Sequence, residues 1–260
     1  MEALPALRRG ALQHSRKTLR PAPSLLSDVL ARRSLHCSQL RYSSTTSSAQ
    51  SNDDQRPDPS SGSSSGKPRY ILTKKQREFL DSALRVNQAG ELAATLIYKA
   101  QTPPVVRSHP HLRPLMKHMY DQEAGHFSTF NKLIAKHQVR PTAMWPIWEL
   151  AATFLGWSTG IMGREAAMAC TEAVETEIGS HYNEQIRELL SWMAEAESRG
   201  EEVDDEIKDL LATLRKTRDE ELEHLDHAVE NDSKEAKPYD PLVNVIRYGC
   251  RGAIWISERI

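Results

Sequence analysis

The sequence predicts an all-α protein whose folded part, residues 69–260, is a bundle of long helices. Apolar residues recur there every three or four positions, which is the period that gives a helix one apolar face. The alternation of apolar and polar residues that marks a half-buried strand is absent, and prolines punctuate the helical stretches. Helices of this kind bury their apolar faces by packing on one another around a shared core.

Six helical segments follow from this pattern. The first begins at Thr73-Lys-Lys-Gln76, a spacing typical of a capping box, and is predicted to end near Gln101 because Pro103 and Pro104 indicate a loop. The last segment is apolar on one side and basic on the other. The predicted ranges are about 73–101, 112–137, 144–163, 164–192, 206–230 and 243–260.

Residues 144–163 differ from the rest of the chain because they hold three tryptophans and a single acid, Glu149. Their length is near that of a membrane span, but Pro146 and three glycines weigh against one. A buried bundle helix and a helix lying in the membrane interface are the alternatives. We favour a short apolar helix with interfacial contact. Together with the amphipathic C-terminal segment, it would give the bundle additional apolar and amphipathic helices for membrane contact.

The first 68 residues are predicted to lie outside the folded domain. Residues 1–42 carry eight basic side chains against two acids, with scattered serines and no long apolar run, which is typical of a mitochondrial transit peptide. An ordinary disordered basic tail is the alternative. Residues 43–68, rich in Ser, Gly, Asp and Pro, are predicted to be a disordered linker. The three cysteines show no CxxC spacing, so neither a disulfide framework nor a thiolate metal site is expected.

The charge of the remaining chain argues against nucleic acid as a partner. Because the first 42 residues are basic, residues 43–260 carry a formal net charge of −7. Binding the phosphate backbone requires a basic face, which an acidic body of this kind does not predict.

Two Glu-x-x-His pairs occur on separate predicted helices. Residues three apart share one face of a helix, so each pair offers a carboxylate and an imidazole to the same point. One helix upstream of each pair, an acid is embedded among small and apolar residues. The six residues of this repeated pattern are Glu91, Glu123, His126, Glu175, Glu221 and His224.

This repeated order is the ligand set of ferritin-like di-iron and di-manganese bundles. Four carboxylates and two imidazoles in a bundle core would be costly without metal, whereas two divalent ions balance the four negative charges. Mixed oxygen and nitrogen ligands suit iron or manganese and do not match a closed structural zinc site. The sequence therefore predicts a ferritin-like four-helix bundle that holds two metal ions.

The acid on the fourth helix is chosen by its neighbours. Glu175 lies on the apolar side, beside Ala173-Val174 and before Ile178, and Glu172 is the alternative. His181 and Tyr182 lie about two turns beyond Glu175, and we expect one or both to support the site as proton-relay or ligand-orienting groups. For His181 an ordinary core histidine is an equal alternative. Three further histidines lack such a context and are expected to be solvated: His118, His137 and His227.

These residues are embedded in stretches that resemble the demethoxyubiquinone hydroxylases of ubiquinone biosynthesis, over about Leu84 to Ile260. One departure is Asn87-Gln88, where Asp-His or Asp-Gln is expected before Ala-Gly-Glu, and it could alter hydrogen bonding around Glu91. The similar stretches are RVNQAGE (85–91), MYDQEAGH (119–126), RPT (140–142), GREAAMACTEAVE (163–175), HYNEQIR (181–187), RDEELEH (218–224) and GCRGAIWISER (249–259).

The resemblance implies that the six residues bind two iron ions, with Glu123 and Glu221 bridging them and with Glu91 and Glu175 as terminal ligands. It implies that a polyprenyl methoxy-methyl-benzoquinol receives one hydroxyl group from O2, with NADH as the source of electrons. The sequence itself shows no Gly-rich nucleotide loop. The resemblance further implies peripheral association with the matrix side of the mitochondrial inner membrane. A lipid-binding partner that presents the substrate and other enzymes of the ubiquinone synthesis complex are the implied protein partners.

Three other functions compete with this interpretation. A mitochondrial di-iron quinol oxidase would reduce O2 to water, but its Asn-Glu-Arg-Met-His stretch is absent and Asp-Gln-Glu-Ala-Gly-His stands here instead. A ferritin-like iron store gives no reason for three tryptophans in an apolar segment. A metal-free scaffold of a lipid-synthesis complex would tolerate the loss of Glu91 or Glu175.

Overall fold

A computed structural model describes residues 68–260, and the predicted transit peptide and all but the last residue of the predicted linker lie outside this range. Apart from one isolated bridge between Arg69 and Glu202, the regular structure of the described residues is helical, which confirms the all-α class. The helices are α1 (Lys74–Ser108), α2 (Arg113–Lys136), α3 (Trp145–Met162), α4 (Arg164–Ser198), α5 (Asp205–Glu230) and α6 (Tyr239–Ser257), with short 3-10 turns at Pro110–Leu112 and Ser233–Glu235.

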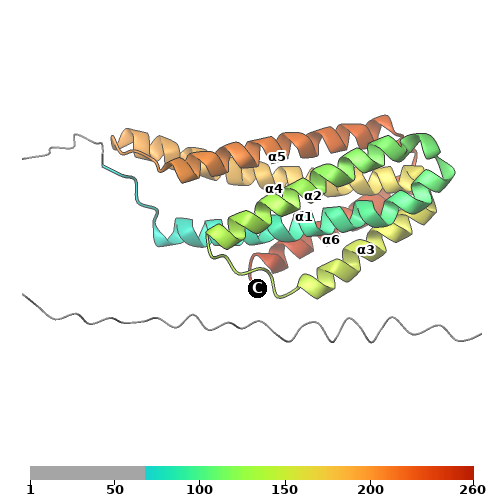
Figure 1. Ribbon diagram of the computed structural model, residues 1–260, viewed down its shortest axis with the longest axis horizontal. Coiled ribbons are helices and arrows are strands. Elements are labelled where there is room, and N and C mark those ends of the chain that lie inside the picture. The colour runs from blue at the N-terminus through green and yellow to red at the C-terminus, as the bar shows by residue number, and fades with distance from the viewer. Residues whose placement is uncertain (1–67) are drawn as a thin grey trace, which may run out of the picture. The chain divides into compact units, whose positions relative to one another are not determined.

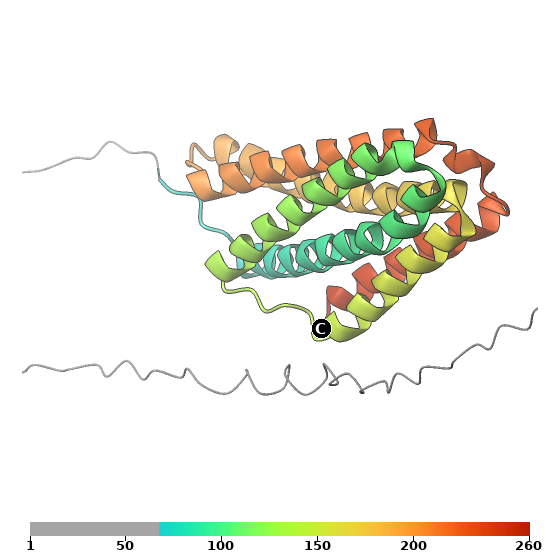
Figure 2. The same ribbon diagram turned by 45° about the vertical axis from the view of Figure 1, so that its right-hand side comes forward.

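Helices α1, α2, α4 and α5 form the four-helix bundle, and α3 and α6 lie along one side of it (Figures 1 and 2). The core of the bundle is divided into apolar clusters. One cluster, around Phe130, Leu189 and Leu214, packs toward one end, and a second, around Met116 and Met168, packs toward the other. The middle of the four helices is left to polar side chains, which is where the predicted metal-ligating residues lie.

Local signals in the sequence set several helix ends. The side chain of Thr73 accepts a hydrogen bond from the Gln76 amide at 3.2 Å, and the Gln76 side chain accepts one from the Thr73 amide at 2.8 Å. The predicted capping box is therefore confirmed. At the other end of the chain, α6 begins at Tyr239 and includes Pro241, because a proline in the first turn of a helix interrupts no intrahelical hydrogen bond.

Two predicted helix ends are wrong. Helix α1 continues through Pro103 and Pro104 to Ser108, so the expected loop does not form there. Buried Val105 and Val106 anchor this last part of α1 in the core, and their burial outweighs the hydrogen bonds that the prolines remove. Helix α4 runs past Trp192 to Ser198.

Helix α4 ends with a Schellman motif. Gly200 adopts a φ of 69°, a left-handed conformation that glycine accepts without strain. The amide of Gly200 donates to the Glu197 carbonyl at 3.0 Å, and the amide of Glu201 donates to the Ala196 carbonyl at 2.9 Å. The turn into α5 is accordingly shorter than the acidic composition of this stretch predicted.

Helix α3 lies on the surface of the bundle and is not enclosed in its core. It buries only a narrow face of small residues, and the interpretation of residues 144–163 as a fully buried helix is therefore wrong. No helix within residues 68–260 combines the length and the apolar character needed to cross a membrane. The residues on the buried face of α3 are Ala152, Gly156, Thr159 and Gly160.

Candidate metal centre

The six residues of the repeated pattern converge in the interior of the bundle. All of them are buried, and none is more than 6% exposed. Because each Glu-x-x-His pair spans about one helical turn, both members of a pair reach the same level of the bundle. Helix α1 supplies Glu91, α2 supplies Glu123 and His126, α4 supplies Glu175, and α5 supplies Glu221 and His224.

These side chains form two overlapping groups of four that share Glu123 and Glu221. In each group, one oxygen or nitrogen atom of every side chain lies within 4.8 Å of the others. Each group thus contains one imidazole, one carboxylate of its own and two carboxylates held in common. The first group is Glu91, Glu123, His126 and Glu221, and the second is Glu123, Glu175, Glu221 and His224.

The spacing of the donor atoms suits bound metal. The Nδ1 atom of His126 lies 3.1 Å from Glu221 Oε1 and 3.4 Å from Glu91 Oε2. The Nδ1 atom of His224 lies 2.9 Å from Glu123 Oε1 and 3.3 Å from Glu221 Oε2. An ion that binds its ligands at about 2.1 Å places neighbouring ligand atoms about 3 Å apart, so each group is close to a coordination shell.

Most of the oxygen and nitrogen atoms of the cluster lack hydrogen-bond partners in the protein. Eight buried donor and acceptor atoms of the cluster make no hydrogen bond of ordinary geometry, and each such atom costs about 1–3 kcal/mol. Two divalent cations would satisfy all of them at once, so the donor set fits a two-metal centre. The eight atoms are Glu91 Oε2, both carboxylate oxygens of Glu123 and of Glu221, Glu175 Oε2, and the Nδ1 atoms of His126 and His224.

The electrostatics of the cluster also favour bound cations. Burial, reinforced by the charge of Glu221, raises the pKa of Glu91, Glu123 and Glu175. Burial acts on Glu221 in the same direction, but its contacts with the two imidazoles outweigh burial and lower its pKa to about 2. Without metal, three of the four carboxylates therefore resist ionisation, and divalent cations would relieve that penalty.

Two buried tyrosines hold the outer carboxylates in place, and they repeat the symmetry of the ligand pattern. The hydroxyl of Tyr182 on α4 donates to Glu91 on α1, and the hydroxyl of Tyr98 on α1 donates to Glu175 on α4 at 2.9 Å. Each tyrosine lies seven residues after the glutamate of its own helix and binds the glutamate of the other. The sequence pattern predicted a supporting role for Tyr182 but not for Tyr98, although both share the Glu-x6-Tyr spacing.

The two imidazoles are oriented from their outer side. His126 Nε2 lies 2.8 Å from Glu220 Oε2, and His224 Nε2 lies 2.9 Å from Gln122 Oε1. Each partner precedes the glutamate of a Glu-x-x-His pair on the opposite helix. A hydrogen bond at one ring nitrogen fixes the tautomer and directs the other nitrogen toward the metal. Sequence analysis did not identify either partner.

The neighbouring acids on α4 have other partners. Glu172, the alternative to Glu175, accepts hydrogen bonds from Ser233, Lys234 and Tyr239 after α5. Glu177 pairs with arginines of α6. The structure therefore places only Glu175 of the three in the buried cluster.

The side chains of the unusual Asn87-Gln88 pair bind partners other than Glu91. Asn87 and Gln185 exchange two amide hydrogen bonds, of 2.8 and 2.7 Å, between α1 and α4. Gln88 donates to Asn131 on α2 at 3.0 Å. Both side chains thus tie helices together next to the cluster.

An apolar cavity of about 420 Å³ adjoins the cluster and is lined by α1, α3, α4 and α6. Its walls are mainly aliphatic, and Trp148 adds an aromatic ring. The few polar side chains at its wall include Glu91, His181 and Tyr182. Burial lowers the pKa of His181, and its Nε2 atom has no hydrogen-bond partner. The cavity therefore presents a neutral imidazole and the edge of the candidate metal centre to an apolar ligand.

The chain matches a family model described as Ubiquinone biosynthesis protein COQ7 over residues 78–257, which include all six residues of the cluster. The 5-demethoxyubiquinone hydroxylase, mitochondrial, of Saccharomyces cerevisiae is 46% identical over 190 residues, covering 73% of this chain and 82% of that protein. The NADPH-dependent 3-demethoxyubiquinone 3-hydroxylase, mitochondrial, of Bos taurus is 41% identical over 184 residues, covering 71% and 79%. The 3-demethoxyubiquinol 3-hydroxylase of Rhodospirillum rubrum is 39% identical over 181 residues, covering 70% and 78%. The extent of these matches confirms the resemblance drawn from the sequence, and the chain belongs to the COQ7 family of ubiquinone biosynthesis proteins.

Proposed function

We propose that this protein is a monooxygenase that hydroxylates the ring of demethoxyubiquinol, a polyprenyl methoxy-methyl-benzoquinol, with O2 in ubiquinone biosynthesis. The observation that carries the proposal is the apolar cavity whose wall includes Glu91, one of the six clustered side chains. A quinol ring in this cavity would lie beside the centre. The names of the relatives support the same reaction class.

The two overlapping groups would hold two iron ions, with Glu123 and Glu221 as the shared ligands and Glu91 and Glu175 as terminal ones. Two ferrous ions supply the electrons that reduce dioxygen. In the overall reaction, one oxygen atom converts a ring C–H group into C–OH and the other leaves as water with two protons. The two electrons that this requires would come from the ferrous ions and be returned to them by the reductant. NADH is the reductant that we propose. The name of the Bos taurus relative specifies NADPH, so reduction should be compared with both nucleotides.

The cavity supplies orientation and exclusion of water. Its aliphatic walls would hold the ring and the first part of the isoprenoid tail, and its volume of about 420 Å³ falls in the range of small-molecule sites. The hydroxyl of Tyr182 donates a hydrogen bond to Glu91, and burial raises the pKa of Tyr182 well above its usual range. This tyrosine therefore stays protonated and keeps Glu91 aimed at the centre.

His181 could accept a hydrogen bond from a ring hydroxyl of the quinol, because it lines the cavity and its Nε2 atom has no hydrogen-bond partner. The His181→Phe variant keeps the size of the side chain and removes this acceptor. We expect turnover to fall by about tenfold, the equivalent of one hydrogen bond of about 1.4 kcal/mol, while metal content stays the same. Steady-state product formation and metal analysis measure the two quantities. Unchanged turnover would show that His181 is an ordinary core histidine.

We propose that α3 and α6 contact the inner membrane and admit the substrate from it. Six large apolar side chains of α3 are more than half exposed, and five of them follow one another at intervals of three and four residues along one face. Trp255 of α6 is also exposed, and Arg259 lies over its ring at 4.2 Å, as expected where an aromatic ring and a cation meet lipid headgroups. Both helices also line the cavity. The five residues of this face are Ile147, Leu150, Phe154, Trp157 and Ile161.

The double variant Leu150→Asp with Phe154→Asp tests this face. Each side chain contributes about 1.5–3 kcal/mol when it leaves water, so binding to vesicles of phosphatidylcholine and cardiolipin should weaken by about a hundredfold or more. Sedimentation with vesicles measures the effect. Leu190→Asp, at an exposed position of α4 outside this face, is the control and should bind as the wild type does. Equal binding of the double variant would mean that another surface contacts the lipid.

Contact of α3 and α6 with the inner membrane also implies where the protein lies in the cell. The relatives from Saccharomyces cerevisiae and Bos taurus are named mitochondrial, and we propose the matrix side of the inner membrane as the location of this chain. A lipid-binding partner would present the substrate to the cavity between α3 and α6. Other enzymes of the ubiquinone synthesis complex would then receive the hydroxylated quinol.

The deciding experiment measures metal content and single-turnover chemistry of residues 43–260 in detergent. The protein is reduced without oxygen, mixed with demethoxyubiquinol and then with O2, and the products are identified by mass spectrometry. Two irons per chain and a hydroxylated ring are expected. Two irons with oxygen consumed and only quinone formed would indicate a quinol oxidase. A protein that binds no metal when iron is abundant would overturn the assignment of the ligands.

A further inference from the structure

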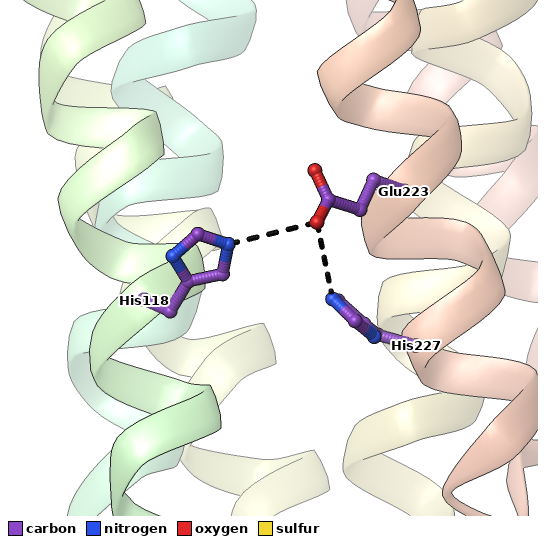
Figure 3. A group of neighbouring side chains, drawn as sticks. All are labelled: His118, Glu223 and His227. Carbon is purple, nitrogen blue, oxygen red and sulfur yellow. Dashed lines mark ion pairs between the residues drawn. The ribbon is translucent and has the colours of Figure 1, made fainter.

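A second group of metal-binding side chains lies on the surface between α2 and α5. His118 of α2 faces Glu223 and His227 of α5 (Figure 3). The sequence predicted that His118 and His227 are simply solvated, but His227 is half-buried and both rings turn toward one carboxylate oxygen. The two imidazole rings meet edge to face, with their centroids 6.3 Å apart.

The spacing of this group approaches that of a coordination shell. Glu223 Oε1 lies 3.5 Å from His227 Nε2 and 3.8 Å from His118 Nε2, and the three atoms all lie within 4.8 Å of one another. A tetrahedral ion with bonds of about 2.0–2.1 Å would separate its ligand atoms by about 3.3 Å. Small rotations of the three surface side chains would bring the observed distances of 3.5 and 3.8 Å to this value.

The surroundings of the group also favour a cation. The other nitrogen of His227, Nδ1, lies 3.6 Å from Glu230 Oε2 on the next turn of α5. A carboxylate on the far side of a histidine is the usual support of a metal-ligating imidazole, because it fixes the ring and raises its basicity. Two imidazoles and one carboxylate with the remaining positions open to water suit Fe²⁺ or Zn²⁺.

On α2 this surface group lies more than one helical turn before Glu123, whereas on α5 Glu223 lies between the ligands Glu221 and His224. His118 lies four residues before Gln122, and Glu223 adjoins His224. Gln122, which is half-buried and one turn after His118 on α2, contacts His224 Nε2 of the buried centre at 2.9 Å. The seam between α2 and α5 therefore joins an exposed set of metal ligands to a buried one.

We propose that His118, Glu223 and His227 form an exposed, labile site for a divalent transition-metal ion, which captures Fe²⁺ at the α2–α5 seam and raises its local concentration for loading of the buried centre. The loading step rests on the proposed metal centre, whereas binding at the surface does not. Metal content and uptake rates test both without any measurement of hydroxylation.

The first test measures Zn²⁺ binding to the iron-loaded full chain by equilibrium dialysis and metal analysis. One zinc ion per chain should bind without loss of iron. Removing a supporting group of a metal ligand costs about 10–100-fold in affinity, so loss of two ligands in His118→Ala with His227→Ala should weaken zinc binding by at least that factor. His111→Gln, an exposed histidine outside the group, is the matched control and should bind zinc as the wild type does. Equal zinc binding by the double variant, or zinc bound only in exchange for iron, would overturn the site.

The second test follows anaerobic Fe²⁺ uptake by the metal-stripped full chain, scored as iron that resists a chelator. The double variant should load about tenfold more slowly, because local concentration of a cation changes its association rate by at least that much, and should reach the same final iron content. Glu223→Gln, which keeps the shape of the side chain and removes its charge, should slow uptake in the same way. Equal uptake rates would overturn the loading role. A low final iron content in the wild type as well would instead count against the buried centre and the proposed function.

Discussion

The Glu221→Gln variant is expected to lose both metal binding and hydroxylation. Glu221 belongs to both groups of four and lies 3.1 Å from His126 Nδ1 and 3.3 Å from His224 Nδ1. The substitution keeps the shape of the side chain but removes the charge and one of the two oxygens of a carboxylate that both ions would share. Metal contributes several kcal/mol to the stabilisation of such a reaction, so product formation should fall by about a thousandfold or more.

Iron per chain by mass spectrometry and hydroxylated product in a single turnover measure the two losses together. Because Glu221 is the charged partner of both imidazoles in the metal-free core, the substitution should also lower stability, and circular dichroism separates loss of metal from loss of fold. Asp226→Asn, at an exposed position on the same helix, provides the control and should retain iron and activity. If Glu221→Gln bound two irons and hydroxylated normally, Glu221 would not be a ligand and the two irons would have to lie at a different site.

The repeated Glu and Glu-x-x-His pattern could be found in the sequence because its spacing is local. Residues three apart on one helix share a face whatever the helix packs against, and the same pattern occurs twice. The supporting residues depend on contacts between helices. Tyr98 binds Glu175 across 77 positions and Gln122 contacts His224 across 102, and no local spacing fixes those distances. The Glu-x6-Tyr repeat was visible but gained its meaning only from the packing of α1 against α4.

Helix ends could likewise be predicted where neighbouring residues set them, and could not where contacts with other helices set them. The capping box at Thr73 was correctly predicted because it is made by neighbouring residues. The continuation of α1 beyond Pro103 was not, because it depends on burial of Val105 and Val106 by other helices. Local propensity disfavours proline inside a helix, and only tertiary packing can reverse that preference.

Gly156→Ala is expected to destabilise the protein because α3 packs directly against the backbone of α1. A Cβ atom at position 156 would lie 2.8 Å from the Cα atom of Ile97, and closer still to the Ile97 carbonyl oxygen. Backbone atoms cannot rotate away as a side chain can, so the two helices must separate. Overpacking of this kind costs about 1–3 kcal/mol or more, and about 3 kcal/mol corresponds to a fall of about 6–12 °C in Tm for a domain of this size.

The same substitution should also reduce substrate binding, because Ile97 and Leu155 line the cavity beside this contact. Gly252→Ala on α6 is the matched control, since a Cβ atom there would meet no atom within 4 Å. Alanine is favoured over glycine inside a helix by up to about 1 kcal/mol, so this control should be as stable as the wild type or more stable. Thermal unfolding of both variants measures the difference, and a quinol-binding assay measures the effect on the cavity. If Gly156→Ala unfolded at the same temperature as Gly252→Ala, α3 would be free to move away from α1, and the cavity would owe its shape to α4 and α6 instead.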